Sequence, residues 1–300
     1  MQTNNTTILI ALAFVLLWNS GFIGADYGLP FTEPFTLLFW RYCGVTFLIL
    51  FYLLIRNRMR RVGPGVAMAN GIVGILAHGV WLSCVLLALD NDVPAGIVAL
   101  VVALQPLATG ALSGIVTGEP TPLHRWLGLI LGFTGVVVTV AARIDFSSSA
   151  SIFGYLIPFG SALSMTAATL IQRRLEIRDR TYSLPVDLTL FYQALATMLI
   201  LAVPAVLIEG LPTSWEIPFI WTMGWLILPV SLGAYALMWV LISRMDATRV
   251  ASLFYLGPPV TMLMAWAAFG DILYKMDVIG LLIVFAGIIV TYLPMGAKKD

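Results

Sequence analysis

Charged residues are scarce in this sequence. They make up 10% of its 300 residues, against roughly 25% in an ordinary soluble domain. Hydrophobic residues, by contrast, make up 60%. This balance excludes a soluble globular fold, and it predicts that the lipid bilayer is the main partner of the chain.

Histidine and cysteine are also scarce, and this limits the chemistry available. His78 and His124 are the two histidines, and neither has a second histidine at the HExxH spacing of a metalloprotease. Ser113, in the segment GALSG, lacks the GxSxG pattern of a serine hydrolase. No phosphate-binding GxxxxGK[ST] loop is present. Cys43 and Cys84 fall inside apolar stretches, where buried, unreactive thiols are expected. We therefore expect no enzyme activity, no metal and no cofactor.

A strong net charge is missing as well. The formal net charge is +1, and no basic cluster is interleaved with aromatic residues, so nucleic-acid binding is excluded. The chain has instead a series of apolar runs, each near the 20 or so residues that a membrane span needs. The sequence predicts an all-α polytopic membrane protein with ten transmembrane helices, near residues 8–26, 34–55, 65–89, 94–117, 123–143, 152–172, 187–208, 218–242, 247–270 and 277–295.

Lysine and arginine are distributed unevenly between the two sets of predicted loops. If the N-terminus is cytoplasmic, only Arg143 and Lys275 face outward and Arg41 lies within a helix. The other thirteen of the sixteen basic residues then lie on the cytoplasmic side. Since positive residues are retained in cytoplasmic loops, both termini are expected to be cytoplasmic.

An internal repeat is the most informative pattern in the sequence. A gap-free shift of 152 residues aligns the following pairs: Pro106 with Pro258, Thr109 with Thr261, Gly118 with Gly270, Glu119 with Asp271, Gly128 with Gly280, Gly135 with Gly287 and Thr139 with Thr291. We predict two domains, residues 1–150 and 151–300. Because each holds five helices, an odd number, the second enters the membrane with the opposite orientation. Inverted repeats of this kind enclose a central site that opens alternately to each side.

Several short motifs follow the same order as in a known family of carriers. They are the Trp18-Asn-Ser-Gly-Phe segment, Arg41, Pro106, Gly118-Glu119 and the run from Gly128 to Gly135, with Pro258, Gly270-Asp271 and Gly280 to Gly287 in the second half. On these residues the whole chain resembles the EamA-type branch of the drug/metabolite transporter superfamily. The resemblance implies a bacterial-type inner-membrane carrier with a central cavity. It looks most like the amino-acid exporters of that branch, including those for aromatic amino acids.

Polar and aromatic residues within the predicted spans are the candidates for substrate contact, because a polar group in the bilayer needs a partner or a cavity. His78 and Trp81 are expected to share one helical face. Helix packing is the alternative for each of these positions. The predicted substrate-binding residues are Trp18, Asn19, Ser20, His78, Trp81, Gln105, Ser164, Met165, Tyr235, Trp239 and Tyr255.

Two prolines and one arginine raise separate questions. Pro106 and Pro258 occupy matching depths in the two halves and are predicted hinges, although membrane helices tolerate proline in general. Arg41 is interpreted as a structural anchor in preference to a substrate ligand. It is expected to snorkel towards the outer surface or to pair with backbone carbonyls or with an acid, for which Asp26 and Glu33 are the candidates.

The substrate class follows by exclusion. A lipophilic-cation pump commonly needs an acid deep in its pathway, and residues 8–25 hold none. A sugar phosphate needs cavity lysines or arginines, and the middle of the second half has none. Neutral or zwitterionic metabolites remain, carried by a secondary transporter that exports amino acids; a multidrug carrier of the same fold is the alternative, followed by a channel or a membrane-embedded enzyme.

Glycines at four-residue spacing in the predicted helices 94–117 and 123–143 indicate close helix contacts. Because ten helices can satisfy such contacts internally, a monomer is expected. The sequence leaves open the particular amino acid, the direction of net flux and any coupling to protons.

Overall fold

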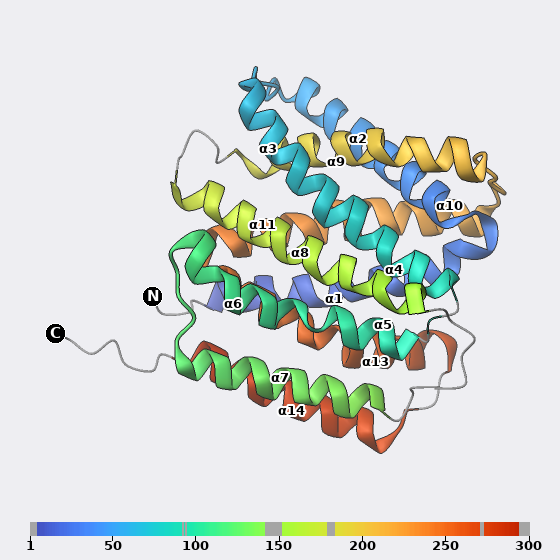
Figure 1. The fold of residues 1–300 in the computed structure, drawn as a ribbon. Coiled ribbons are helices and arrows are strands. Elements are labelled where there is room, and N and C mark those ends of the chain that lie inside the picture. The colour runs from blue at the N-terminus through green and yellow to red at the C-terminus, as the bar shows by residue number, and fades with distance from the viewer. Residues whose placement is uncertain are drawn as a thin grey trace.

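The computed structural model of the protein describes residues 5–91, 93, 95–141, 152–178, 184–270 and 273–293. In these parts of the chain, ten helical spans are long and apolar enough to cross a membrane, as predicted (Figure 1). Some residues on which the repeat and the charge distribution depend lie outside the described residues: Asp271, Arg143, Arg180, Lys298 and Lys299.

Each half of the chain supplies five spans, some of them interrupted. The first five are α1 (Asn5–Gly28), α2 (Pro34–Ile55), α3 (Pro64–Gly74) continued by α4 (Trp81–Asp90), α5 (Ala95–Val102) continued by α6 (Gln105–Thr117), and α7 (Leu123–Ala141). The second five are α8 (Ile152–Arg178), α9 (Val186–Pro204), α10 (Ile217–Trp225) continued by α11 (Tyr235–Arg244), α12 (Ala247–Ser252) continued by α13 (Gly257–Phe269), and α14 (Lys275–Tyr292).

The predicted and observed boundaries agree best where a helix is apolar to both ends. The span predicted at 34–55 coincides with α2. Helix α8, predicted to end at residue 172, continues to Arg178. Hydropathy marks only the part of a helix that lies in the bilayer core, whereas backbone hydrogen bonding continues into the polar region.

The interruptions occur at repeat-related places. A π-helical segment, Ile75–Val80, joins α3 to α4, and a second one, Leu226–Ala234, joins α10 to α11. Proline is the second residue of α6 and of α13, at Pro106 and Pro258. Proline fits the first turn of a helix, but it has no N–H to donate to the preceding turn. Both breaks in the helices therefore have a local cause. Whether they act as hinges stays a prediction.

The helices pack in a pattern that is preserved when the two halves are exchanged. Helix α7 lies beside α14, and α2 packs on α9 (Figure 1). Helix α1 contacts α13, and its counterpart α8 contacts α6. Helix α1 begins and α14 ends at the same end of the bundle (Figure 1). This exchange symmetry is the inverted-repeat arrangement that the sequence predicts.

Glycines make the closest helix contact possible. A Cβ atom on Gly128 would lie 2.6 Å from the carbonyl oxygen of Gly287, and one on Gly280 would lie 2.6 Å from that of Gly135. The predicted close contact in the fifth span is therefore found, between the two halves. Gly118 ends α6 with a left-handed φ of 74°, a conformation that only glycine adopts without steric cost.

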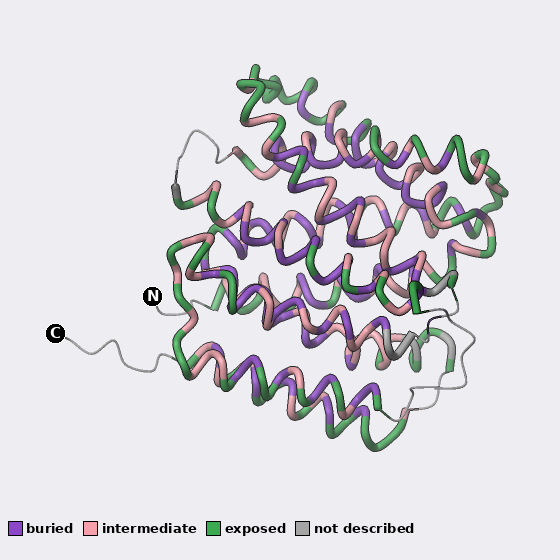
Figure 2. The backbone as a smooth tube through the Cα atoms, viewed as in Figure 1, coloured by how far each residue is buried: buried purple, intermediate pink, exposed green. Residues whose placement is uncertain are grey.

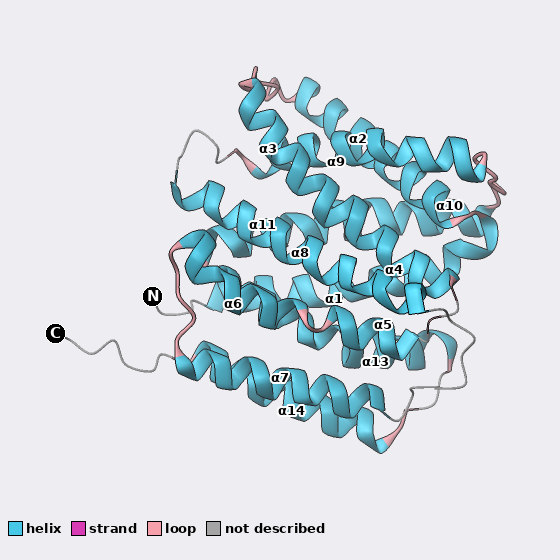
Figure 3. Cartoon of the chain, viewed as in Figure 1, coloured by secondary structure: helices cyan, strands magenta, loops and turns pink. Residues whose placement is uncertain are grey.

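Buried residues line the inner faces of the helices and exposed ones cover the outside (Figure 2). Many of the exposed side chains are large and apolar, as a surface against lipid tails requires. The loops of the described part of the chain gather at the two ends of the bundle, except for a short turn between α5 and α6 that lies within it (Figure 3). Cys43 and Cys84 are free thiols and only half-buried, whereas the sequence predicted buried thiols.

Candidate substrate cavity

A central cavity of about 390 Å³ lies between α1, α4, α5 and the α12–α13 span. Its size falls in the range of small-molecule sites. Asn19 and Thr261 are the polar non-aromatic side chains in the lining. The lining residues are Trp18, Asn19, Phe22, Trp81, Val85, Val98, Ala99, Val102, Ala103, Phe254, Gly257, Pro258, Thr261 and Met262.

Aromatic rings form one wall of this cavity. The ring centroids of Trp18 and Trp81 lie 5.2 Å apart, and those of Trp18 and Phe254 lie 5.1 Å apart with the rings nearly perpendicular. Phe22 follows Trp18 by one helical turn, and its ring centroid lies 6.1 Å from that of Trp81. Edge-to-face arrangements of this kind fix the rings in place, so the wall offers a large, rigid apolar surface to a ligand.

The polar groups of the cavity are partly used within the protein. The Asn19 side-chain amide donates to the Val15 carbonyl at 2.7 Å. The Thr261 hydroxyl donates to Asn19 Oδ1 at 3.1 Å. The pair links α1 to α13 beside Pro258, at the break in that span.

A second, narrow pocket of about 40 Å³ adjoins the central cavity and has Trp18, Phe22, Trp81 and Val85 in common with it. Arg41 lines this pocket. Its Nε donates to Ser231 Oγ at 2.6 Å. Asp26 and Glu33, predicted as partners of Arg41, are both exposed and make no ion pair with it in the described structure, because they lie beyond the buried part of the helix.

A vestibule of about 520 Å³ lies at the end of the bundle where α1 ends and α2 begins. It is lined mainly by the two loops 29–34 and 212–214. These loops are joined by the hydrogen bond from Thr32 Oγ1 to the Pro212 carbonyl, 2.7 Å long. Leu86 lines both the vestibule and the narrow pocket. Leu86 therefore lies between the vestibule and the narrow pocket, and the narrow pocket shares a wall with the central cavity.

His78 does not share a face with Trp81, contrary to prediction. Trp81 lines the central cavity, whereas His78 lies against α9 with its Nε2 at 3.1 Å from Gln193 Oε1. The Trp239 indole donates to the same oxygen at 2.8 Å. The π-helical segment Ile75–Val80 causes the difference, because its i→i+5 bonding adds residues to each turn and rotates the faces.

Gln193 is a residue of this buried network that the sequence reasoning missed. It accepts two hydrogen bonds and is itself buried in α9. An amide in the middle of an apolar span, where every polar group needs a partner, was the signal that could have found it. The sequence reasoning also missed Phe22 and Thr261 in the cavity lining. Two signals could have found them: Phe22 follows Trp18 by four residues, and Thr261 is the repeat partner of Thr109.

The other predicted contact residues lie away from the central lining. Tyr235 lines the narrow pocket and donates its hydroxyl proton to the Ala77 carbonyl at 2.9 Å. Ser20 faces α10, where it accepts from the Trp225 indole. Gln105, Ser164, Met165 and Tyr255 are buried among neighbouring helices. Substrate contact at these positions stays a prediction.

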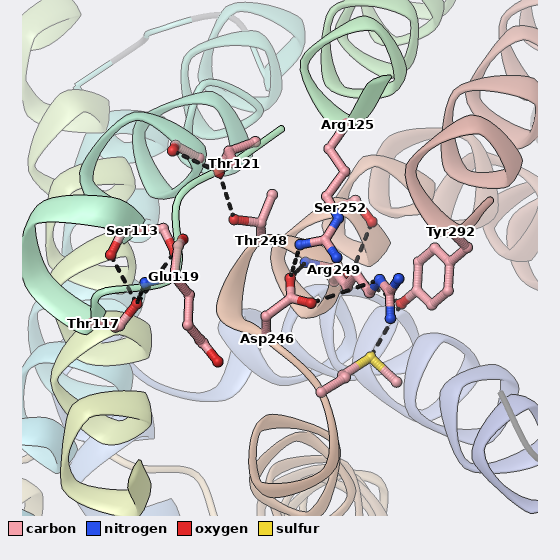
Figure 4. A network of polar contacts seen from close by, with 12 residues as sticks. Ser113, Thr117, Glu119, Thr121, Arg125, Asp246, Thr248, Arg249, Ser252 and Tyr292 are labelled. Atoms are coloured by element: carbon pink, nitrogen blue, oxygen red, sulfur yellow. Dashed lines mark hydrogen bonds and ion pairs between the residues drawn. The ribbon is translucent and has the colours of Figure 1, made fainter. Parts of the chain in front are cut away.

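Ion pairs join the two halves at the end of the bundle where α1 begins and α14 ends, which we call the arginine-rich end (Figure 4). Asp246, between α11 and α12, pairs with Arg125 Nη1 at 3.0 Å and accepts from the backbone N–H of Arg249 at 3.1 Å. The hydroxyls of Thr121 and Thr248 lie 3.1 Å apart. These contacts hold the start of α7 against the start of α12.

Two further ion pairs strengthen the same end. Arg173 Nε donates to Glu119 Oε2 at 2.9 Å, and its Nη1 donates to the Ile242 carbonyl. Arg58 pairs with Asp187 at 2.8 Å. The arginine-rich end is thus tied by partly buried charges, while the vestibule lies at the opposite end.

The chain is similar in sequence to known membrane transporters. The sequence model of the EamA-like transporter family matches residues 5–141 and again 152–293. A transporter of Archaeoglobus fulgidus is 26% identical over 97% of this chain and 98% of its own. A Salmonella typhimurium protein named "Probable amino-acid metabolite efflux pump" is 23% identical over 97% of this chain and 96% of its own. An Escherichia coli inner membrane transporter is 25% identical over 93% of this chain and 88% of its own.

A solved crystal structure has the same fold. It superposes with a TM-score of 0.76 at 22% identity, covering 96% of this chain and 97% of the other.

Proposed function

The chain belongs to the EamA-like transporter family, and we propose that it is a secondary transporter that exports amino acids or similar small zwitterionic metabolites by alternating access. The observation that carries the proposal is the cavity of about 390 Å³ between the inverted repeats, apolar and aromatic with two polar side chains. Such a lining suits a small substrate that has an apolar side chain and a few polar atoms.

The two ends of the bundle support alternating access. The vestibule adjoins the cavity region from one end, while ion pairs close the arginine-rich end. Exchange of the conformations of the two halves would reverse this arrangement. The interrupted spans, broken near Pro106 and Pro258, supply places where the backbone can bend.

The charge distribution favours an inner-membrane orientation with both termini in the cytoplasm. The arginine-rich end then faces the cytoplasm, and the present form is the one accessible from outside. The named Salmonella relative supports amino-acid metabolites as substrates, and the Escherichia coli relative supports the inner membrane. On this proposal the protein is a carrier and not an enzyme, and it works as a monomer.

The test is uptake by the purified protein in liposomes. The panel contains aromatic, aliphatic and charged amino acids, a lipophilic cation and a sugar phosphate, each measured with and without a pH gradient. Saturable uptake of neutral amino acids supports the proposal, and a dependence on the gradient would reveal proton coupling. Movement of the lipophilic cation without any amino acid would favour the alternative, a multidrug carrier of the same fold.

A further inference from the structure

Arg41 is a buried cation that has no acidic partner among the described residues. It lies seven residues after Pro34, the start of α2, which is about 10 Å along the helix axis at 1.5 Å per residue. The residue is 3% exposed. The ion pairs between described side chains do not include it.

The nearby acids are engaged or turned away. Asp26 and Glu33 are exposed. Glu209 accepts hydrogen bonds from the backbone N–H groups of Phe35 and Thr36, at 2.9 and 2.7 Å. The Glu209 carboxylate therefore balances the partial positive charge at the N-terminus of α2 and does not pair with the guanidinium of Arg41.

The neutral contacts of Arg41 leave most of its donors available. Its Nε donates to Ser231 Oγ, and its Cζ lies 5.7 Å from the centroid of the Tyr42 ring. A guanidinium has five N–H donors in a fixed fork, so the two terminal nitrogens, with four N–H groups, remain. Ser231 thus fixes the side chain at one edge of the fork.

Arg41 lines the narrow pocket beside the central cavity. The narrow pocket that Arg41 lines contains no acidic residue, and its wall includes Trp18 and Trp81 of the central cavity. At about 40 Å³ it exceeds the roughly 10–15 Å³ that one water molecule needs, so it has room for a small polar group. A whole amino acid does not fit there, whereas a carboxylate-sized group does.

A charge inside a membrane protein is costly unless a partner meets it, and such charges mark binding sites. The partner that fits a guanidinium best is a carboxylate, through two parallel hydrogen bonds. We infer that Arg41 binds the carboxylate of the substrate, while the apolar side chain of the substrate occupies the aromatic cavity. This assignment rests on the proposed function for the identity of the substrate. It differs from the structural anchor that the sequence led us to expect.

Ligand-induced thermal stabilisation of the purified full-length protein tests the assignment, because a ligand stabilises the state that it binds. One series of probes is phenylalanine, phenylalaninamide and 3-phenylpropanoate; the matched aliphatic series is leucine, leucinamide and 4-methylpentanoate. The acids, with or without the ammonium group, should bind at least about tenfold more tightly than the amides, equivalent to about 1.4 kcal/mol.

Substitutions identify the residue responsible. Arg41→Gln should remove the preference for acids over amides while leaving amide binding unchanged. Arg41→Lys keeps the charge but not the fork, so it should weaken acid binding alone. Ser231→Ala should do the same more mildly. Arg61→Gln, in the exposed loop before α3, removes an equal charge elsewhere and should change nothing.

The results separate this inference from the proposed function. If the Arg41→Gln variant retains the full preference for acids, the inference is overturned, even where liposome uptake of amino acids is confirmed. If that variant does not fold, Arg41→Lys takes its place in this test. Equal binding of acids and amides by the native protein in both series would also overturn it. If liposomes show no amino-acid uptake but acids bind through Arg41, the proposed substrate is wrong and the carboxylate site stands.

Discussion

Gly128 and Gly287 meet across the two halves of the protein with no side chain between them. A Cβ atom on Gly128 would lie 2.6 Å from the Gly287 carbonyl oxygen and 2.7 Å from the backbone nitrogen of Thr291. The repeat-related contact, between Gly280 and Gly135, has the same geometry. The backbones of α7 and α14 can approach this closely only because both helices carry glycine here.

Replacement of Gly128 by alanine should destabilise the protein by about 1–3 kcal/mol, the usual cost of overpacking a close contact. Alanine should lower the midpoint of thermal unfolding measured by intrinsic fluorescence. Gly224 is the matched control, because a Cβ atom there would meet nothing within 4 Å. Equal effects of the two substitutions would contradict the importance of the α7–α14 crossing.

Replacement of Trp81 by alanine should reduce transport without unfolding the protein. The indole forms part of the aromatic wall of the cavity and contacts Trp18. Loss of this contact should weaken apparent substrate affinity about tenfold, equivalent to about 1.4 kcal/mol. Liposome uptake over a range of substrate concentrations measures it. Trp221→Ala is the control, since that side chain is 77% exposed on the outer surface; unchanged uptake by the Trp81 variant would remove the aromatic wall from the substrate site.

Alanine at Pro106 and Pro258 together should slow the exchange between the two transport forms. Each proline begins the second part of an interrupted span, and alanine would favour a continuous, stiffer helix. Paired spin labels at the two ends of the bundle should report a slower exchange. Pro158→Ala offers a comparison within the uninterrupted helix α8, and exchange as fast as in the native protein would exclude the hinge role.

Replacement of Asp246 by asparagine should favour the form that opens at the arginine-rich end. The substitution removes the ion pairs with Arg125 and Arg249. A change of about 1.4 kcal/mol between the two forms would alter their ratio tenfold. Spin labels at Leu123 and Arg244 should show a longer distance. Asp26→Asn, at the exposed far end of α1, is the control, and an identical distance distribution in both variants would argue against a gate here.

Hydropathy and repetition identified the architecture from the sequence. The ten spans, the inverted halves and the glycine contacts of α7 follow from local composition and from the 152-residue shift, because lipid requires each span to be apolar and to satisfy its own backbone. Pro106 and Pro258 likewise occupy the breaks that their positions predict, since the effect of proline on a helix is local.

The arrangement of the site was less predictable. Trp18, Asn19 and Trp81 line the central cavity, as the polar and aromatic pattern suggested. His78 lies elsewhere, because a π-helical segment changes the register of its face, and no short-range sequence rule locates such a segment.

Local sequence therefore specifies a ten-span membrane transporter built as two similar halves, since bilayer thickness and backbone hydrogen bonding act on each segment separately. Which side chains share a space depends on how the helices pack together. Arg41, Trp18 and Tyr235 come from three different spans and line one narrow pocket. Such a meeting depends on how helices distant in the sequence cross one another, and that is set by the packing of the whole bundle.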